Sequence, residues 1–296
     1  MRIAPRDAWG RPIDLPSILD GGQTFTWWAT GCGDGKGSGG DGLVAFEGSV
    51  GPWRVRLQVD PALPPGALEE DPWDPEGARA AIERLLDLGR NYDELDEALL
   101  RRDPLLAPVV RATPGIRIVR LAPWEALVSF VLSSHTHIAR IKAMVRRLRE
   151  TFSEDGVSFP PPHALAAAGE DALRNLRLGY RARYLHRLAE VVAATPGVLE
   201  QWGALPTQAA RSALMGLVGV GHKVADCVLL FGYGRWDAFP IDRWVRRAME
   251  SVYFGGRAAA PSRVAELARA RFGELAALAQ AHLFASARLG EKRRSA

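Results

Sequence analysis

The chain has 296 residues, 47% of them hydrophobic and 24% charged, which allows two domains with real cores and excludes an extended disordered protein. No run approaches the ~18 apolar residues of a membrane-spanning helix, and two cysteines exclude a disulfide framework or a four-thiolate metal site. Residues 1–112 hold 12 basic and 19 acidic residues, a net −7, whereas residues 113–296 hold 26 and 15, a net +11. The basic second half indicates a polyanionic partner.

The N-terminal half begins with strand patterns and then turns helical. No apolar core follows the first residues, so they lack the form of a secretory signal, and we expect a cytoplasmic protein. Alternating and β-branched patterns predict strands, and a Gly- and Asp-rich loop is expected over 31–42. A Pro- and acid-rich connector spans 61–76, after which spacing near 3.6 predicts helices. The strands are expected over 23–28, 43–46 and 53–59, and the helices over 78–88 and 92–101.

Thr113-Pro114-Gly115 interrupts the chain where the charge balance reverses, so we place a domain boundary there. Helical patterns dominate beyond it. The expected fold class is α+β: a small N-terminal antiparallel β-sheet domain over 1–112 and a larger all-α domain over 113–296. The helices of the second domain are expected over 123–132, 138–152, 163–168, 170–176, 181–193, 207–214, 224–231, 242–251 and 261–289.

The segment Leu217-Val218-Gly219-Val220-Gly221-His222-Lys223 lies between two apolar helical patterns. Two glycines around one apolar residue allow a tight turn with exposed backbone N–H groups, which can hold a phosphate at a helix N-terminus. Lys223 falls in the first turn of the next helix. Only four of the 38 basic residues are lysines, and an amine placed there is a candidate nucleophile.

Asp242 lies 19 residues further on, in Phe239-Pro240-Ile241-Asp242, directly before another helical pattern. Its position predicts an N-cap. The intervening loop is long enough to bring the carboxylate beside Lys223, where an anion would stabilise a developing cation.

The hairpin and Pro240-Ile241-Asp242 together resemble the helix-hairpin-helix and Gly/Pro-Asp signature of base-excision DNA glycosylases. Within that superfamily the chain is most similar to eukaryotic-type 8-oxoguanine DNA glycosylases. The resemblance runs from about Leu19 to Leu289. It implies that Lys223 is the nucleophile and Asp242 the electrostatic partner, and a lysine at this place marks the members that also cleave the strand.

Two further motifs resemble the segments that form the pocket for the damaged base in this family. Gly21-Gly22-Gln23-Thr24-Phe25 is similar to the family segment in which the glycine at the place of Gly22 offers its carbonyl to the N7 hydrogen of 8-oxoguanine. Ala279-Gln280-Ala281-His282-Leu283-Phe284 is similar to the family's C-terminal helix. The resemblance implies that Gln280 bonds the edge of the base, and that Phe284 and Cys227 enclose its two faces.

Two more segments resemble the family's contacts to the DNA helix, namely 133–141 and 178–184. The resemblance implies that Tyr180 wedges into the base stack and that Arg140 and Arg181 hold the unpaired cytosine. Gly219 and Gly221 would hold the backbone. His135 stands where the family usually has Asn, so the preference for the opposite base stays open. Trp244 replaces a phosphate-holding His, and His222 replaces a hydroxyl residue.

The expected function is therefore a bifunctional DNA glycosylase and AP lyase that excises 8-oxoguanine from double-stranded DNA. The expected protein is monomeric and nucleoid-associated, and needs no redox cofactor or catalytic metal; a monovalent cation at the hairpin stays open. Two alternatives remain. One is an alkylpurine glycosylase without lyase activity, and the other is a non-catalytic helix-hairpin-helix DNA-binding protein.

Overall fold

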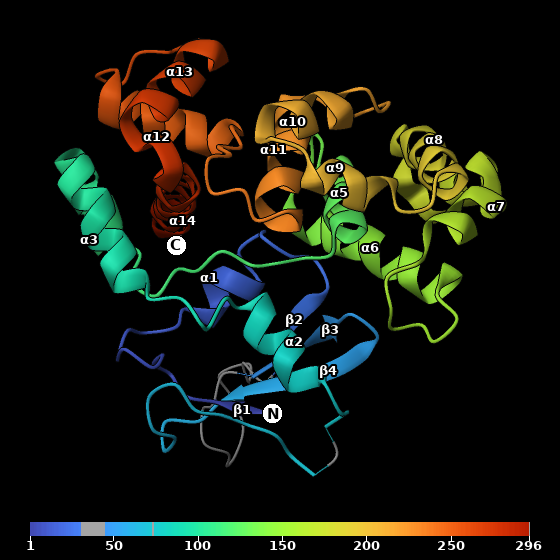
Figure 1. Cartoon of the computed structure of the whole chain (residues 1–296), viewed down its shortest axis with the longest axis horizontal. Helices are drawn as coiled ribbons and strands as arrows, with labels where there is room; N and C mark the ends of the chain where they lie inside the picture. Colours follow the sequence, from blue (N-terminus) through green and yellow to red (C-terminus); the bar gives the residue numbers. More distant parts are fainter. Residues whose placement is uncertain (31–44, 73, 296) are drawn as a thin grey trace.

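The computed structural model describes residues 1–30, 45–72 and 74–295, and their side chains as far as Glu291. Within these residues a small five-stranded sheet lies at one end of a larger helical body (Figure 1). The predicted α+β class is confirmed. None of the helices in this described part combines the length and the apolar character that crossing a membrane requires.

The sheet has the order β2-β3-β4-β1-β5. The β1–β4 pair is parallel and the other three pairs are antiparallel. The expectation of an antiparallel sheet is therefore wrong for the β1–β4 pair. Trp27 pairs with Gly48, and a Cβ at Gly48 would lie 2.2 Å from the Trp27 ring, so glycine is required for the ring to be buried. The expected loop over 31–42 lies outside the described residues. The strands are Arg2–Ile3 (β1), Trp27–Thr30 (β2), Ala45–Val50 (β3), Trp53–Val59 (β4) and Leu68–Glu69 (β5).

The helical spacing of the sequence predicted most of the helices within one or two residues. The single pattern expected over 261–289 is wrong as one helix, because Gly273 adopts φ +54° and separates α13 from α14. Three short helices, α1, α4 and α9, were not expected. The helices are Leu15–Leu19 (α1), Ala78–Leu85 (α2), Tyr92–Arg102 (α3), Ala107–Arg111 (α4), Pro123–Leu132 (α5), Ile138–Phe152 (α6), Pro162–Leu173 (α7), Arg181–Ala194 (α8), Val198–Ala204 (α9), Thr207–Met215 (α10), His222–Cys227 (α11), Arg243–Tyr253 (α12), Pro261–Phe272 (α13) and Ala276–Ser295 (α14).

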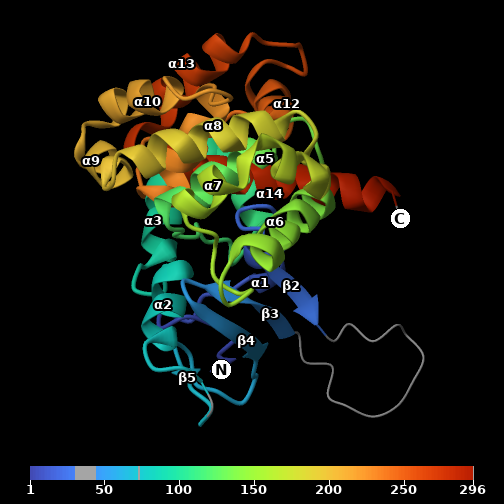
Figure 2. The ribbon, with the colours of Figure 1, turned by 90° about the vertical axis from the view of Figure 1, so that its right-hand side faces the viewer.

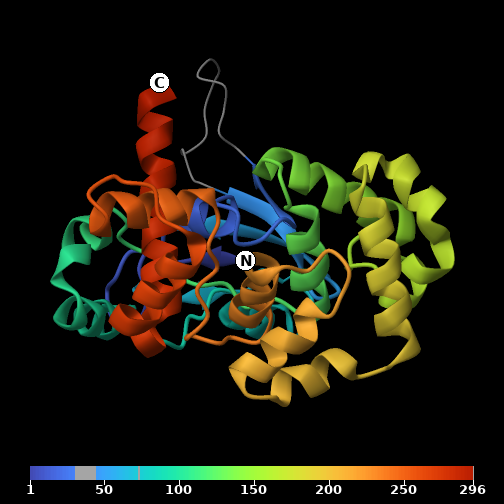
Figure 3. The same ribbon diagram turned by 90° about the horizontal axis from the view of Figure 1, so that it is seen from above.

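Two hydrophobic cores organise these elements. The larger core joins the sheet to α5–α11, and the smaller one joins α3 and α4 to α12–α14. Figures 1 and 2 show the sheet beneath the helices, and Figure 3 shows α14 running past the other helices. The predicted boundary at 112/113 stays a prediction, and α3, which precedes it, packs against α13 and α14.

Helix α14 belongs to both cores. Ala277, Ala281 and Ala285, spaced by four residues on one face, pack into the larger core, whereas Leu278 and Leu283 pack into the smaller one. A helix buried on two sides places the residues between these faces at the junction of the cores. Gln280 and Phe284 lie on this stretch of α14.

Candidate active site

The hairpin between α10 and α11 depends on its glycines. Gly219 adopts φ +83°, and a Cβ there would lie 2.7 Å from the Tyr184 ring of α8. Gly221 is the N-cap of α11 and has open space where a Cβ would stand. Val218, between the helices, is 51% exposed. The turn therefore packs closely against α8 on one side and presents bare backbone on the other.

Lys223 lies in the first turn of α11 and is half-buried. Its Nζ donates to the Ser133 hydroxyl over 2.8 Å and stands 5.0 Å from the centre of the Phe130 ring. Ser133 follows α5, and its Oγ donates to the Phe130 carbonyl over 2.7 Å. Because the single hydroxyl proton is used in that bond, Ser133 acts toward Lys223 as an acceptor. The amine is therefore held in place by a group outside its own helix.

Cys227 is the last residue of α11, and the charges of Lys223 and Asp242 both influence its buried thiol. Burial raises the pKa of its thiol to about 12; the charge of Lys223 opposes this shift, and the carboxylate of Asp242 adds to it. The predicted proximity of the Lys223 amine to the Asp242 carboxylate stays a prediction. A neutral, buried thiol behaves as a small apolar wall rather than as a nucleophile.

Asp242 caps α12, which confirms the predicted N-cap. Its Oδ1 accepts hydrogen bonds from the N–H groups of Trp244 and Val245, each over 2.8 Å. Both bonds use the same oxygen, so the cap fixes the carboxylate while Oδ2 takes no part in capping. The residue is half-buried, so a charge beside it is incompletely screened by water.

Two of the predicted base-pocket residues, Gln280 and Phe284, lie on α14, and Gly22 approaches Phe284. The Gln280 side chain is buried, and its Nε2 donates to the Pro240 carbonyl over 3.3 Å, two residues before Asp242. Gly22 adopts φ +105°, and a Cβ there would lie 2.7 Å from Ile138 and 3.7 Å from the Phe284 ring. The loop before β2, the start of α6 and α14 therefore share one place in the structure, although 258 residues separate Gly22 from Gln280.

Two buried polar residues that sequence reasoning did not select fix this arrangement. Gln23 donates to the Arg117 carbonyl over 2.8 Å and accepts from the Val119 N–H over 3.1 Å, which anchors the loop of Gly22. The ring of His282 on α14 bonds to Thr113 over 2.7 Å and to Asp96 over 2.9 Å. Both stand inside the motifs quoted above, but only the fold reveals their partners.

Two of the residues predicted to contact DNA, Tyr180 and Arg181, meet at the Ser134 carbonyl. Tyr180 is 48% exposed and donates to that carbonyl over 3.2 Å, and Arg181 donates to it through Nη2. His135, in the left-handed region at φ +50°, and Arg140, in the first turn of α6, are exposed. Arg181 is buried, so its predicted role toward an unpaired cytosine stays a prediction.

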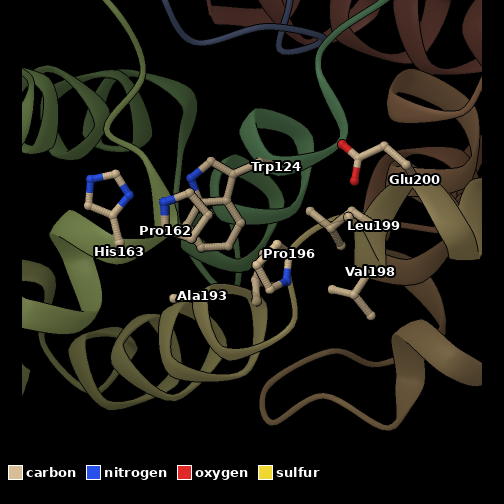
Figure 4. Close-up of a pocket in the computed structure, with 10 residues that line it drawn as sticks. Trp124, Pro162, His163, Ala193, Pro196, Val198, Leu199 and Glu200 are labelled. Atoms are coloured by element: carbon tan, nitrogen blue, oxygen red, sulfur yellow. The ribbon is translucent and has the colours of Figure 1, made fainter.

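In the part of the chain that the structure describes, no group of three or more His, Cys, Asp and Glu residues is arranged to hold a metal ion. A cavity of about 320 Å³ opens elsewhere, between α5, α7, α8 and α9 (Figure 4). Trp124, Pro162 and Val198 line it, with His163 and Glu200 at its edges. None of the predicted site residues lines this cavity.

The comparisons with known proteins agree with this geometry. Residues 10–127 match the family model of the 8-oxoguanine DNA glycosylase N-terminal domain, and residues 128–274 match that of the HhH-GPD superfamily of base excision DNA repair proteins. The solved structure of MBOgg1 with a low-affinity DNA ligand is 30% identical, with a TM-score of 0.79 over 94% of this chain and 93% of that one. The chain belongs to the 8-oxoguanine DNA glycosylase family.

Other members of the family give similar values. The 8-oxoguanine glycosylase/lyase of Clostridium acetobutylicum, in complex with double-stranded DNA containing cytosine opposite 8-oxoG, is 27% identical, with a TM-score of 0.78 over 94% of this chain and 93% of that one. The N-glycosylase/DNA lyase OGG1 of Arabidopsis thaliana is 29% identical in an alignment of 290 positions that covers 92% of this chain and 76% of that protein.

Proposed function

We propose that this chain is a bifunctional DNA glycosylase and AP lyase that removes 8-oxoguanine from double-stranded DNA and then cleaves the strand. The observation that carries the proposal is the amine of Lys223 in the first turn of the hairpin helix, held by the Ser133 hydroxyl over 2.8 Å in a chain of this family. A damaged base inside a duplex cannot be reached, so it is first rotated out of the stack, at a cost of a few kcal/mol.

The chemistry follows from the amine of Lys223 and the carboxylate of Asp242. The neutral amine of Lys223 attacks C1′ while the bond from C1′ to the base breaks and the base leaves with the electron pair. Positive charge builds on the sugar at that moment, and the fixed carboxylate of Asp242 stabilises it. Opening of the sugar ring gives a Schiff base, which acidifies the C2′ hydrogen; loss of that proton expels the 3′ phosphate by β-elimination.

Lys223 is the lysine that suits this step. Of the four lysines, Lys36 and the side chain of Lys292 lie outside the described part of the structure. Lys142 is buried and bound to Asp20 and to the Trp27 carbonyl. Lys223 is half-buried and is held by a neutral hydroxyl.

Recognition of the base is assigned to the junction of the two cores. We assign the carbonyl of Gly22 to the N7 hydrogen that 8-oxoguanine has and guanine lacks, because a carbonyl aimed at a bare N7 meets lone-pair repulsion. Gln280 then reads the edge of the base, and Phe284 and Cys227 enclose its faces. The close approach of Phe284 to Gly22 supports this assignment.

We assign the contacts to the DNA double helix to the surface around Ser134 and to the hairpin between α10 and α11. Tyr180, an exposed aromatic ring, fills the space left by the rotated base, and the exposed Arg140 and His135 face the unpaired partner. Gly219 and Gly221 expose backbone N–H groups to a phosphate. We propose double-stranded DNA containing oxidised guanine as the partner and a monomer, located with the nucleoid in the cytoplasm, as the working form.

Borohydride reduction tests the proposal, because it fixes a Schiff base as a stable adduct. We expect a covalent adduct with a duplex containing 8-oxoguanine, and no adduct with Lys223→Gln. Release of the base without an adduct would favour an alkylpurine glycosylase, and binding without release would favour a non-catalytic module. The same assay with each of the four bases opposite the lesion measures the preference that His135 leaves open.

A further inference from the structure

Lys142 is a buried lysine of α6 that the proposed chemistry does not use. It is 5% exposed, and its Nζ forms an ion pair with Asp20 and donates to the carbonyl of Trp27. The Nζ also stands 6.0 Å from the centre of the Trp28 ring. Burial lowers the pKa of this amine, and the carboxylate of Asp20 opposes that shift. Burial of an ammonium group is costly unless the group is paired. The ion pair with Asp20 and the hydrogen bond to Trp27 therefore offset the cost of burying Lys142.

The two partners of Lys142 bracket the loop of Gly22. Asp20 ends α1, where its N–H donates to the Pro16 carbonyl over 3.0 Å, and Trp27 is the first residue of β2. One ammonium group therefore holds both ends of the segment 21–26. Inside that segment the anchors already described are the hydrogen bonds of Gln23.

Helix α6 also sets the position of Gly22 directly. Ile138 and Lys142 are four residues apart, on one face of α6. The Ile138 side chain packs against Gly22 so closely that a Cβ added to Gly22 would lie 2.7 Å from it. Lys142 holds the two ends of the loop. Loss of the ammonium would release the loop ends from the helix that supports its centre. The chemistry at Lys223 lies on a different helix, α11.

We propose that Lys142 is a positioning residue for base recognition: with Asp20 it clamps the loop 20–27 so that the Gly22 backbone is fixed against Phe284 in the base pocket. This inference rests on the proposed function and deepens it. Removal of the clamp impairs selection of 8-oxoguanine, and it leaves the lyase step, which needs no base, intact.

The test compares two reactions of the same variants. Single-turnover excision of 8-oxoguanine requires the base pocket, whereas cleavage of a duplex with a preformed abasic site requires Lys223 without the pocket. For Lys142→Met and Asp20→Ala we expect excision to fall about 10- to 100-fold, and cleavage at the abasic site to stay within about twofold of the unchanged protein. We also expect the ratio of the excision rate at 8-oxoguanine to that at guanine to fall in both variants.

The matched control is Arg146→Met, one turn further along α6, which removes a cation that stacks on Trp28 at 4.5 Å. It should leave the ratio of the two reactions unchanged. A parallel loss of both reactions in Asp20→Ala, or no loss of excision in either variant, would overturn the proposal. Should Lys142→Met fail to fold, Asp20→Ala decides alone, because the Asp20 side chain is 50% exposed. Absence of 8-oxoguanine excision in the unchanged protein would instead contradict the proposed function.

Discussion

The Nζ atom of Lys223 lies 2.8 Å from the hydroxyl oxygen of Ser133, which in turn donates to the carbonyl of Phe130. This pair joins the hairpin helix α11 to the end of α5. It orients the amine without placing a second charge beside it, because a hydroxyl is neutral. Ser133 therefore acts on the reaction through the position of Lys223.

Ser133→Ala removes that acceptor. We expect the rate of Schiff-base formation, measured by borohydride trapping in single turnover, to fall about 3- to 30-fold because the amine is less well oriented. DNA affinity should not change. Ser134→Ala is the matched control, since Tyr180 and Arg181 contact the main-chain carbonyl of Ser134. Equal rates in the two alanine variants would show that the contact has no role in orienting Lys223.

Asp242→Asn separates charge from capping. Asparagine caps helices as well as aspartate does, so we expect stability within about 0.5 kcal/mol of the unchanged protein, with DNA binding retained. Single-turnover excision should fall at least about 100-fold because the carboxylate charge is lost. Thermal unfolding, a binding titration and a quench-flow assay measure the three quantities. Undiminished excision would remove the electrostatic role of Asp242.

Gln280→Ala tests the reading of the base edge. The side chain is buried and donates to the Pro240 carbonyl; its loss costs about 1–3 kcal/mol, within the roughly 5–15 kcal/mol of a typical domain, so we expect the variant to fold. We expect the preference for 8-oxoguanine over guanine to fall about 10-fold, and affinity for undamaged duplex to change by less than about threefold. Competition between the two duplexes in a single reaction measures the preference. An unchanged preference would contradict the assignment.

Glu125 should make stability depend on pH. Burial raises the pKa of its carboxyl from 4.5 to about 7, with Arg149 and a hydrogen bond from Thr26 opposing the shift. Between those two pH values the unfolded chain has lost this proton and the folded protein retains it, so stability falls as pH rises, and it is constant above about pH 7. Glu125→Gln should remove this slope and raise stability at pH 8 by about 1–3 kcal/mol. Urea unfolding at pH 5 and pH 8 measures it, and equal slopes in both proteins would contradict it.

The sequence predicted the features that local rules determine. Periodicity located α5 and α6 to the residue, and the position of Asp242 before an amphipathic pattern predicted its cap. The helix break at Gly273 was not predicted, because an apolar pattern continues across this glycine, whose φ of +54° ends α13. Helix α14 is buried on two sides, so its pattern could not reveal which core it joins.

Contacts between distant segments could not be predicted from local patterns. Nothing in the sequence near Lys142 indicates Asp20, 122 residues earlier, as its partner. Ser133 stood in a quoted motif, but a serine near a helix end is first interpreted as a cap. Its role becomes visible only when the fold brings Lys223, 90 residues later, within hydrogen-bond distance.

Mapping the reduced adduct tests the central claim most directly. The protein is incubated with a duplex containing 8-oxoguanine in the presence of borohydride, digested, and analysed by mass spectrometry for the lysine that carries the sugar remnant. We predict the modification on Lys223, and none in Lys223→Gln, where Lys142 is still present. An adduct on a different lysine, or base excision with no adduct at all, would contradict the account.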